Sequence, residues 1–335
     1  MILTMTAGWD ARARTIAPGF LASLVIAAAA TFLSEHYGAP VMLFALLLGM
    51  AMNFLADDGK CAKGVEFAAR HVLRIGVALL GARITLDQIV ALGWQPVAMV
   101  ILAVVLTITL SMLVARWMGF LSLFGLLSGG ATAICGASAA LALSAALPAH
   151  PGKERATLFT VIVVSTLSTI AMMAYPAIVR LVGLDATDAG IFLGGTIHDV
   201  AQVVGAGYSL SEETGDVATV VKLMRVAMLL PVIIVAGMIT RARSAGEAVE
   251  RPPLLPWFVL AFIVLVINSL GWIAAPVQQW GSDLSRWCLV TAIAAIGVKT
   301  QLRELRSVGL RPIVLMLGET VFLAGLVLAM LRIAS

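Results

Sequence analysis

The chain has 335 residues, of which 61% are apolar and only 12% are charged, and its formal net charge is +4. An ordinary soluble domain carries about 25% charged residues, and half of that supply cannot cover a surface that faces water. The composition therefore excludes a soluble enzyme, a nucleic-acid-binding protein and a disordered chain. It indicates a polytopic membrane protein.

The apolar residues fall into long, continuous runs, which predict membrane helices rather than the alternating strands of a β-barrel. We expect one all-α integral membrane domain over residues 1–335, with about 9–11 transmembrane helices, since a span needs about 20 apolar residues. The expected apolar segments are 16–34, 39–56, 71–92, 95–118, 122–147, 157–181, 188–209, 217–240, 254–275, 284–299 and 308–333.

The first segment has two interpretations. Arg12 and Arg14 precede an apolar run that ends in Ala27–Ala30, an arrangement shared by cleaved signal peptides and retained first spans. The run continues to Leu33 and everything after it is also membrane-like, which favours a retained span.

Two segments are poor continuous helices. Residues 128–138 read SGGATAICGAS, and residues 194–202 read GGTIHDVAQ. Paired glycines beside hydroxyl and charged residues weaken a helix, and irregular backbone at membrane depth occurs only where protein buries it or where it lines a water-filled cavity. We therefore expect two broken or re-entrant helices. The alternative is that the glycines are close-packing contacts between helices.

Short similarities indicate an internal duplication. The segment 81–96 shares its glycine, basic, leucine and proline positions with 297–312, and a related run follows each Gly-Gly segment. The expected repeats cover about 39–181 and about 188–333, and a permuted order of their elements is compatible with the similarities. Re-entrant Gly-Gly segments would make the repeats inverted. With both segments re-entrant, 15 Lys and Arg residues fall on the N-terminal side and 4 on the other. This bias predicts a cytoplasmic N-terminus in a bacterial inner membrane.

Ionisable residues within apolar segments are the main functional candidates, because an isolated charge in hydrocarbon is costly. His198 and Asp199 lie in the second Gly-Gly segment, whereas Lys222 and Arg225 lie at i and i+3 and share a helix face. Two cations with a titratable pair suit an anion site coupled to protons, with His198 and Asp199 in the coupling role. Asp199 as a sodium ligand remains an alternative.

Backbone amides at the breaks and nearby polar groups complete the predicted substrate site. Its residues are Ser128, Gly129, Gly130, Thr132, Ser138, Gly194, Gly195, Thr196, Gln202, Lys222 and Arg225. Two structural alternatives stay open. The cations could only neutralise Asp199 and Glu319, with Glu319 expected to pair with a cation, and the His198–Asp199 pair could be a structural hydrogen-bonding element.

Signatures of catalysis are missing from the sequence. No HExxH, GxSxG, complete GxGxxG or phosphate-binding loop occurs, and the three cysteines form no CxxC pair. We expect no enzyme activity, no cofactor and no metal centre.

The motifs SGGATAICGASA at 128–139, GGTIHDVAQ at 194–202 and KLMR at 222–225 resemble the YeiH-like family of bacterial inner-membrane proteins, which carry the label of sulfate exporters. The similarity extends from about residue 16 to the end of the chain. It implies a many-helix membrane protein with a transport role.

Together these observations predict a secondary transporter that exports or exchanges a small anion, with sulfate or an organosulfonate as the leading substrates. Its expected partners are that anion and the lipid bilayer, not nucleic acid, and a homo-oligomer is compatible with the sequence. The competing hypotheses are an anion channel, a sodium-coupled carrier of organic acids and a structural membrane protein without flux.

Overall fold

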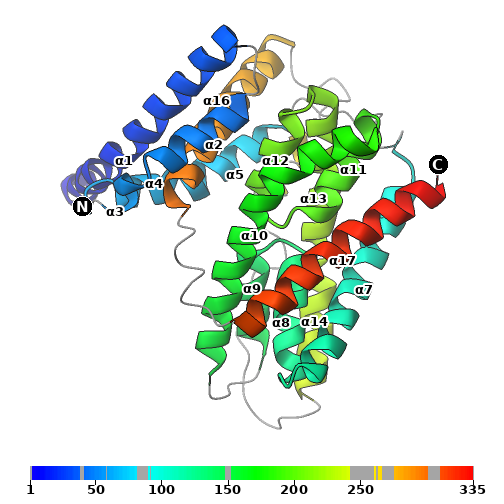
Figure 1. Ribbon diagram of the computed structural model, residues 1–335. Coiled ribbons are helices and arrows are strands. Elements are labelled where there is room, and N and C mark those ends of the chain that lie inside the picture. The colour runs from blue at the N-terminus through cyan, green and yellow to red at the C-terminus, as the bar shows by residue number, and fades with distance from the viewer. Residues whose placement is uncertain are drawn as a thin grey trace. The chain divides into compact units, whose positions relative to one another are not determined.

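The computed structural model describes residues 2–37, 41–57, 59–80, 90, 92–147, 152–241, 260–261, 263–265, 275–300 and 310–334. All the regular secondary structure in these ranges is helical, which confirms the all-α prediction (Figure 1). The chain divides into two compact units: unit 1 comprises Met1–Val90 and Trp257–Gln301, and unit 2 comprises Ala91–Pro256 and Leu302–Ser335.

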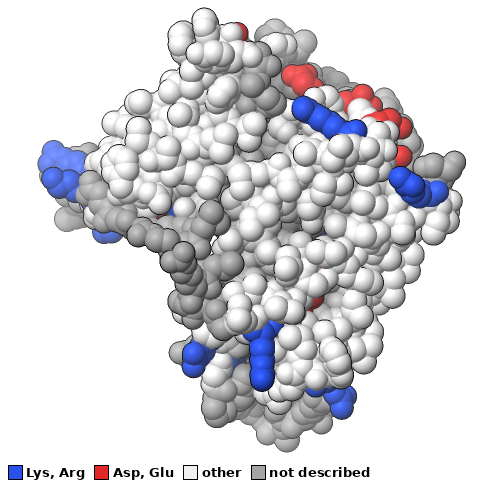
Figure 2. Space-filling view, viewed as in Figure 1, with Lys and Arg blue, Asp and Glu red and all other residues white. Residues whose placement is uncertain are grey.

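Five helices in the described ranges are long and apolar enough to cross a membrane. They are Arg14–Tyr37, Gln95–Trp117, Arg155–Val182, Glu212–Met238 and Leu310–Ile333. Large apolar side chains on their outer faces are exposed, for example Leu102, Val105 and Leu113 between Gln95 and Trp117. Figure 2 shows that most of the described surface in this view is uncharged, with few Lys, Arg, Asp or Glu side chains. Such a surface suits a bilayer.

Unit 1 contains six α-helices and one π-helical segment within its described residues. They are α1 (Ile2–Tyr37), α2 (Val41–Ala51), α3 (Phe54–Asp57), α4 (Ala62–Phe67), η1 (Ala68–Val72), α5 (Leu73–Leu80) and α16 (Ala275–Lys299). Glycines allow close helix contacts here: a Cβ on Gly49 of α2 would lie 2.2 Å from the carbonyl oxygen of Ala294 in α16. Small residues serve this purpose where lipid removes the hydrophobic driving force between helices.

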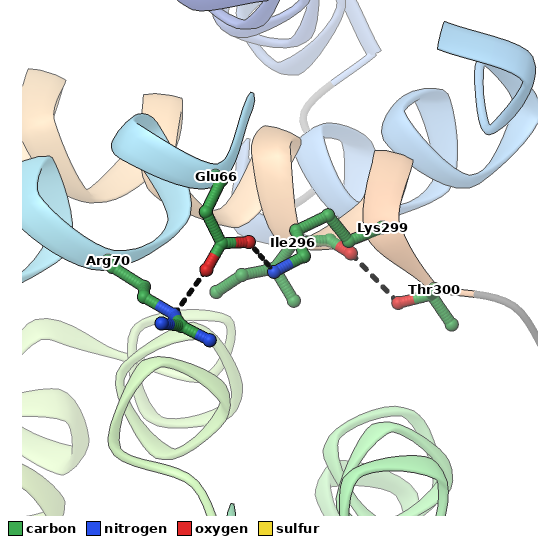
Figure 3. A network of polar contacts seen from close by, with 5 residues as sticks. All are labelled: Glu66, Arg70, Ile296, Lys299 and Thr300. Atoms are coloured by element: carbon green, nitrogen blue, oxygen red, sulfur yellow. Dashed lines mark hydrogen bonds and ion pairs between the residues drawn. The ribbon is translucent and has the colours of Figure 1, made fainter. Parts of the chain in front are cut away.

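A polar network joins α4, η1 and the end of α16 in unit 1 (Figure 3). The carboxylate of Glu66 forms ion pairs with both Arg70 and Lys299. The hydroxyl of Thr300 donates a hydrogen bond of 2.9 Å to the carbonyl oxygen of Ile296. The side chains of the ion pairs are partly exposed, as expected for charges near the end of a membrane helix.

Unit 2 contains α7 (Gln95–Trp117), α8 (Ser122–Ala133), α9 (Ala137–Ala146), α10 (Lys153–Val182), α11 (Ala186–Thr196), α12 (Val200–Tyr208), α13 (Glu212–Ala227), α14 (Leu229–Arg241) and α17 (Leu310–Ala334). The predicted broken helices are the pairs α8–α9 and α11–α12. Figure 1 shows α8 and α9 toward the lower end of this unit, and α11 and α12 toward its upper end. The two broken helices thus enter unit 2 from opposite ends (Figure 1), and the inverted repeat itself stays a prediction.

Some predicted segments differ from the structure or lie outside it. The expected span at 39–56 is divided, because α2 ends at Ala51 and α3 starts at Phe54. Most of the expected span at 254–275, and most of the repeat motif shared by 81–96 and 297–312, lie outside the described residues. The proposed repeat boundaries therefore stay a prediction.

Candidate functional site: two broken helices joined by buried cations

The first break separates α8 from α9 at residues 134–136. Gly136 has φ +66° and ψ −132°, a conformation that a residue with a Cβ rarely adopts. Its amide donates a hydrogen bond of 2.8 Å to the carbonyl oxygen of Ala131, which closes the end of α8. The chain therefore breaks six residues after the glycine pair, at a third glycine.

The second break separates α11 from α12 at residues 197–199. Ile197 is extended, with φ −64° and ψ 137°, and ends α11. Asp199 caps α12, because its carboxylate accepts a hydrogen bond of 2.8 Å from the amide of Ala201. The amide of Asp199 donates in turn to the hydroxyl of Ser168 on α10. A carboxylate at this position also complements the positive end of the helix dipole.

Lys222 on α13 joins the two breaks. Its side chain is fully buried, and Nζ donates to the carbonyl oxygens of Ile134 (2.6 Å), Ile197 (3.0 Å) and His198 (2.5 Å). An ammonium group has three donors, so these contacts engage all of them. The breaks thus meet around one buried cation.

Arg225 lies one turn further along α13 and makes the same kind of contact. Its guanidinium is 1% exposed and donates four hydrogen bonds of 2.8–3.0 Å to carbonyl oxygens. The acceptors are Thr132 and Ala133 at the end of α8, and Gly194 and Ile197 at the end of α11. The carboxyl ends of helices carry partial negative charge, which two cations complement. The predicted shared face of Lys222 and Arg225 is therefore confirmed.

The imidazole of His198 is buried beside these cations and uses both nitrogens. Nδ1 lies 2.9 Å from the carbonyl oxygen of Thr132, and Nε2 lies 3.1 Å from Oγ1 of Thr320 on α17. His198 thus links the second break to the first and to α17. Asp199 is close enough to Lys222 to interact with it electrostatically.

Glu319 of α17 is the site residue that the sequence interpretation placed wrongly. It pairs with no cation in the described part of the chain, and its carboxylate instead accepts hydrogen bonds from three hydroxyl groups. Ser111 (2.5 Å) and Ser128 (2.7 Å) donate to Oε1, and Thr132 (2.9 Å) donates to Oε2. Two of these donors were predicted site residues. Their convergence on one carboxylate depends on helix packing, which no local pattern encodes.

The glycine pairs lie within helices α8 and α11, before the breaks: Gly130 lies four residues before Ile134, and Gly195 lies two residues before Ile197. A Cβ on Gly129 would lie 2.5 Å from Cβ of Ser111, on Gly130 it would lie 2.3 Å from the side chain of Leu143, and on Gly194 it would lie 2.4 Å from the carbonyl oxygen of Ala218. These three glycines therefore act as close-packing contacts, the alternative interpretation. Gly195 has more room, with its nearest neighbour at 3.4 Å.

The other predicted substrate residues differ in accessibility. Thr196 is buried, and its hydroxyl donates to the carbonyl oxygen of Phe192 in the same helix. Gln202 is 4% exposed, and its Nε2 donates to Thr169. Its Oε1 has no partner in the described part of the chain. Ser138, in the first turn of α9, is exposed. The accessible part of the site thus lies at the start of α9.

The fold and the site define a helical integral membrane protein in which two opposed broken helices meet around buried cations. The sequence profile of a family described as "Conserved hypothetical protein 698" matches residues 18–316. The chain is 57% identical over 314 residues to a UPF0324 membrane protein of Chlorobaculum tepidum, covering 93% of this chain and 88% of the relative.

The chain is also similar to two proteins named UPF0324 membrane protein TauZ. The one from Paracoccus denitrificans is 54% identical over 311 residues, covering 92% of each chain, and the one from Paracoccus pantotrophus is 53% identical over 320 residues, covering 94% of this chain and 95% of the relative. The chain therefore belongs to the UPF0324 family of membrane proteins, which confirms the predicted family. No solved structure matches it.

Proposed function

We propose that this protein is a secondary active transporter that carries a small anion across the bacterial inner membrane. The observation that carries the proposal is the meeting of two opposed broken helices around Lys222 and Arg225. Many secondary transporters place their substrate at such discontinuous helices, near the middle of the bilayer.

The start of α9 is the proposed anion contact. The amides of Ala137 and Ser138 have no hydrogen-bond acceptor in the described residues, and Ser138 is exposed. α12 differs, because the carboxylate of Asp199 already caps it. Free amides at the positive end of a helix suit an oxyanion. Lys222 and Arg225 act on that anion through their charge, since their donors are directed at carbonyl groups.

Charged residues at the two ends of unit 2 support an orientation. One end carries exposed Arg116, Arg155 and Arg311, whereas the other carries exposed Asp185, Glu212 and Glu213 together with Arg180 and Arg332. Lys and Arg are enriched in cytoplasmic loops. We therefore place the basic end of unit 2 on the cytoplasmic side. The Lys and Arg bias of the sequence supports a cytoplasmic N-terminus separately.

Sulfate and organosulfonates are the proposed substrates. The two buried cations favour an anionic substrate, and the resemblance to proteins labelled as sulfate exporters favours a sulfur oxyanion. Coupling is assigned to protons, with His198 and Asp199 at the tip of the second break taking part through their contacts with Lys222. The carbonyl oxygen of His198 accepts a hydrogen bond from Lys222, and Asp199 interacts with Lys222 electrostatically, so both respond to a change of charge in this cluster.

Counterflow of labelled sulfate in proteoliposomes tests the proposal, with Lys222→Met as the variant and Lys60→Met as the control. Lys222 is fully buried, whereas Lys60 is exposed in unit 1. We expect counterflow in the wild type and in Lys60→Met, and a sulfate affinity at least tenfold lower in Lys222→Met. A tenfold change in affinity corresponds to a loss of about 1.4 kcal/mol in binding free energy when the charge is removed. Size-exclusion chromatography and thermal unfolding establish that each variant is folded.

The other outcomes separate the rival functions. Equal counterflow in Lys222→Met would remove the cations from the mechanism. Flux without counterflow would indicate a channel, and sodium dependence with a carboxylate substrate would indicate an organic-acid carrier. No flux of sulfate, sulfonates or carboxylates by folded protein would contradict transport of a small anion.

A further inference from the structure

The carboxyl group of Glu319 is buried in unit 2 and surrounded by hydroxyl groups rather than by cations. The residue is 3% exposed, and its three hydrogen-bond donors come from α7 and α8. The ion pairs of Glu66 with Arg70 and Lys299 lie in unit 1 and do not involve this residue. Among the described residues no cation contacts this carboxylate directly, and a buried charge without an adjacent counter-ion is costly, so the site favours a group that can become neutral.

Ser111 allows the carboxyl group to exist in two protonation states without movement of the surrounding atoms. Its Oγ lies 2.5 Å from Oε1 of Glu319 and 2.7 Å from the carbonyl oxygen of Gly125, but it has only one proton to donate. When Glu319 is ionised, the hydroxyl donates to the carboxylate. When Glu319 is protonated, its O–H donates to Ser111, and Ser111 donates to Gly125.

Thr320, the next residue on α17, offers the same choice to His198. Its Oγ1 lies 2.8 Å from the carbonyl oxygen of Met316 and 3.1 Å from Nε2 of His198. The threonine hydroxyl donates to neutral imidazole or accepts from it. Two adjacent residues of α17, Glu319 and Thr320, thus take part in hydrogen bonds whose direction can reverse.

Thr132 connects the carboxyl group to the cations. Its hydroxyl donates to Glu319, while its carbonyl oxygen accepts from Arg225 and lies next to Nδ1 of His198. The elements around this point bring Lys222 and Arg225 from α13, His198 and Asp199 from the second break, Cys135 from the first break and Tyr175 from α10.

The formal charges in this cluster balance when both acids are ionised, because Lys222 and Arg225 then oppose Asp199 and Glu319. Protonation of Glu319 leaves one net positive charge, which an anion can compensate. Binding of a proton and binding of an anion therefore favour each other, and the coupling is reciprocal.

We propose that Glu319 is the proton-binding residue of the carrier and that a proton and the substrate anion bind together. The coupling part of this inference rests on the proposed function, whereas the protonation of Glu319 does not. His198 next to two cations is the less favourable place for an additional positive charge.

Infrared spectroscopy of the protein in lipid, with no anion substrate added, tests the proton site by itself. We expect a pH-dependent carbonyl band of a buried carboxylic acid in the wild type and in Glu66→Gln, and its loss in Glu319→Gln. Glu66→Gln is the matched control, because it removes a carboxylate from the ion pairs of unit 1. The same pH-dependent band in Glu319→Gln would overturn the proposal.

Binding of labelled sulfate at different pH values tests the coupling. We expect the wild type and Glu66→Gln to bind sulfate roughly tenfold more tightly at low pH than at high pH, within the usual range of coupling between sites. Glu319→Gln should bind independently of pH, at the low-pH strength of the wild type. Unchanged pH dependence in Glu319→Gln would overturn the coupling even where sulfate binding supports the transporter.

Replacement of sodium by choline completes the test. If sulfate binding by the wild type depends on sodium, and Glu319→Gln loses that dependence rather than a pH dependence, the site binds a sodium ion and the proposal of a proton site is wrong. If the wild type binds no sulfate, the proposed substrate fails, and the infrared result still decides whether Glu319 binds a proton.

Discussion

Replacement of Arg225 by alanine tests whether this side chain holds the ends of α8 and α11 together. The guanidinium donates to four carbonyl oxygens, and two of these have a second donor. The carbonyl oxygen of Thr132 also contacts His198, and that of Ile197 also accepts from Lys222. Arg225→Ala therefore leaves only the other two carbonyl oxygens, at the ends of α8 and α11, without the hydrogen-bond donor that Arg225 supplies.

Those two acceptors are the carbonyl oxygens of Ala133 and Gly194, which accept from Arg225. A buried polar group that loses its partner costs about 1–3 kcal/mol, so Arg225→Ala should lower the free energy of unfolding by roughly 2–6 kcal/mol. Folded domains are stable by only about 5–15 kcal/mol, so the effect is measurable. Arg225→Lys should cost less, because it keeps the charge with fewer donors.

Denaturant unfolding in detergent micelles measures this loss, and hydrogen exchange locates it. The control is Arg180→Ala, an exposed arginine near the end of α10, which should change stability by about 0.5 kcal/mol or less. Amides on both sides of the two breaks should exchange faster in Arg225→Ala than in the control. Equal stability and equal exchange in the two variants would refute the structural role of the guanidinium.

Three further substitutions test the packing around the site and in unit 1. Gly136→Ala should destabilise the protein by about 1–3 kcal/mol in thermal unfolding, because φ of +66° strains any residue with a Cβ. Gly194→Ala should lower the free energy of unfolding by about 1–3 kcal/mol, because its Cβ would press on the carbonyl oxygen of Ala218. The control Gly318→Ala meets no atom within 4 Å and should be neutral or stabilising. Similar effects of the two substitutions would contradict the packing argument. Lys299→Met should lower stability by about 1 kcal/mol or less, since its ion pair is partly exposed, and a larger loss in denaturant unfolding would show an energetic role for the network.

The broken helices could be predicted because their signals are local. Glycines, hydroxyl groups and charges within an apolar run weaken a helix wherever the run lies, and Lys222 and Arg225 share a face by spacing alone. The position of each break was less accessible to this reasoning. The glycine pairs drew attention to 129–130 and 194–195, but the chain breaks at 134–136 and 197–199, because the pairs are needed for packing.

The surroundings of Glu319 could not be predicted from sequence patterns. Its donors lie on α7 and α8, and Ser111 is 208 residues away along the chain. A buried glutamate suggests a cation partner because ion pairing is the common way to offset a buried charge. Three hydroxyl groups perform that task here, and serine and threonine are too frequent in membrane helices to signal it.

The contacts of Lys222 and Arg225 also limit how the molecule can move. Each cation binds carbonyl groups from both broken helices, so α8 and α11 cannot separate or slide past each other without the loss of several buried hydrogen bonds. Opening and closing at the breaks themselves is therefore too costly for a repeated cycle. In the proposed transporter the two tips and α13 would therefore move as one rigid body, and spectroscopic probes placed across the breaks should keep a constant distance when substrate is added.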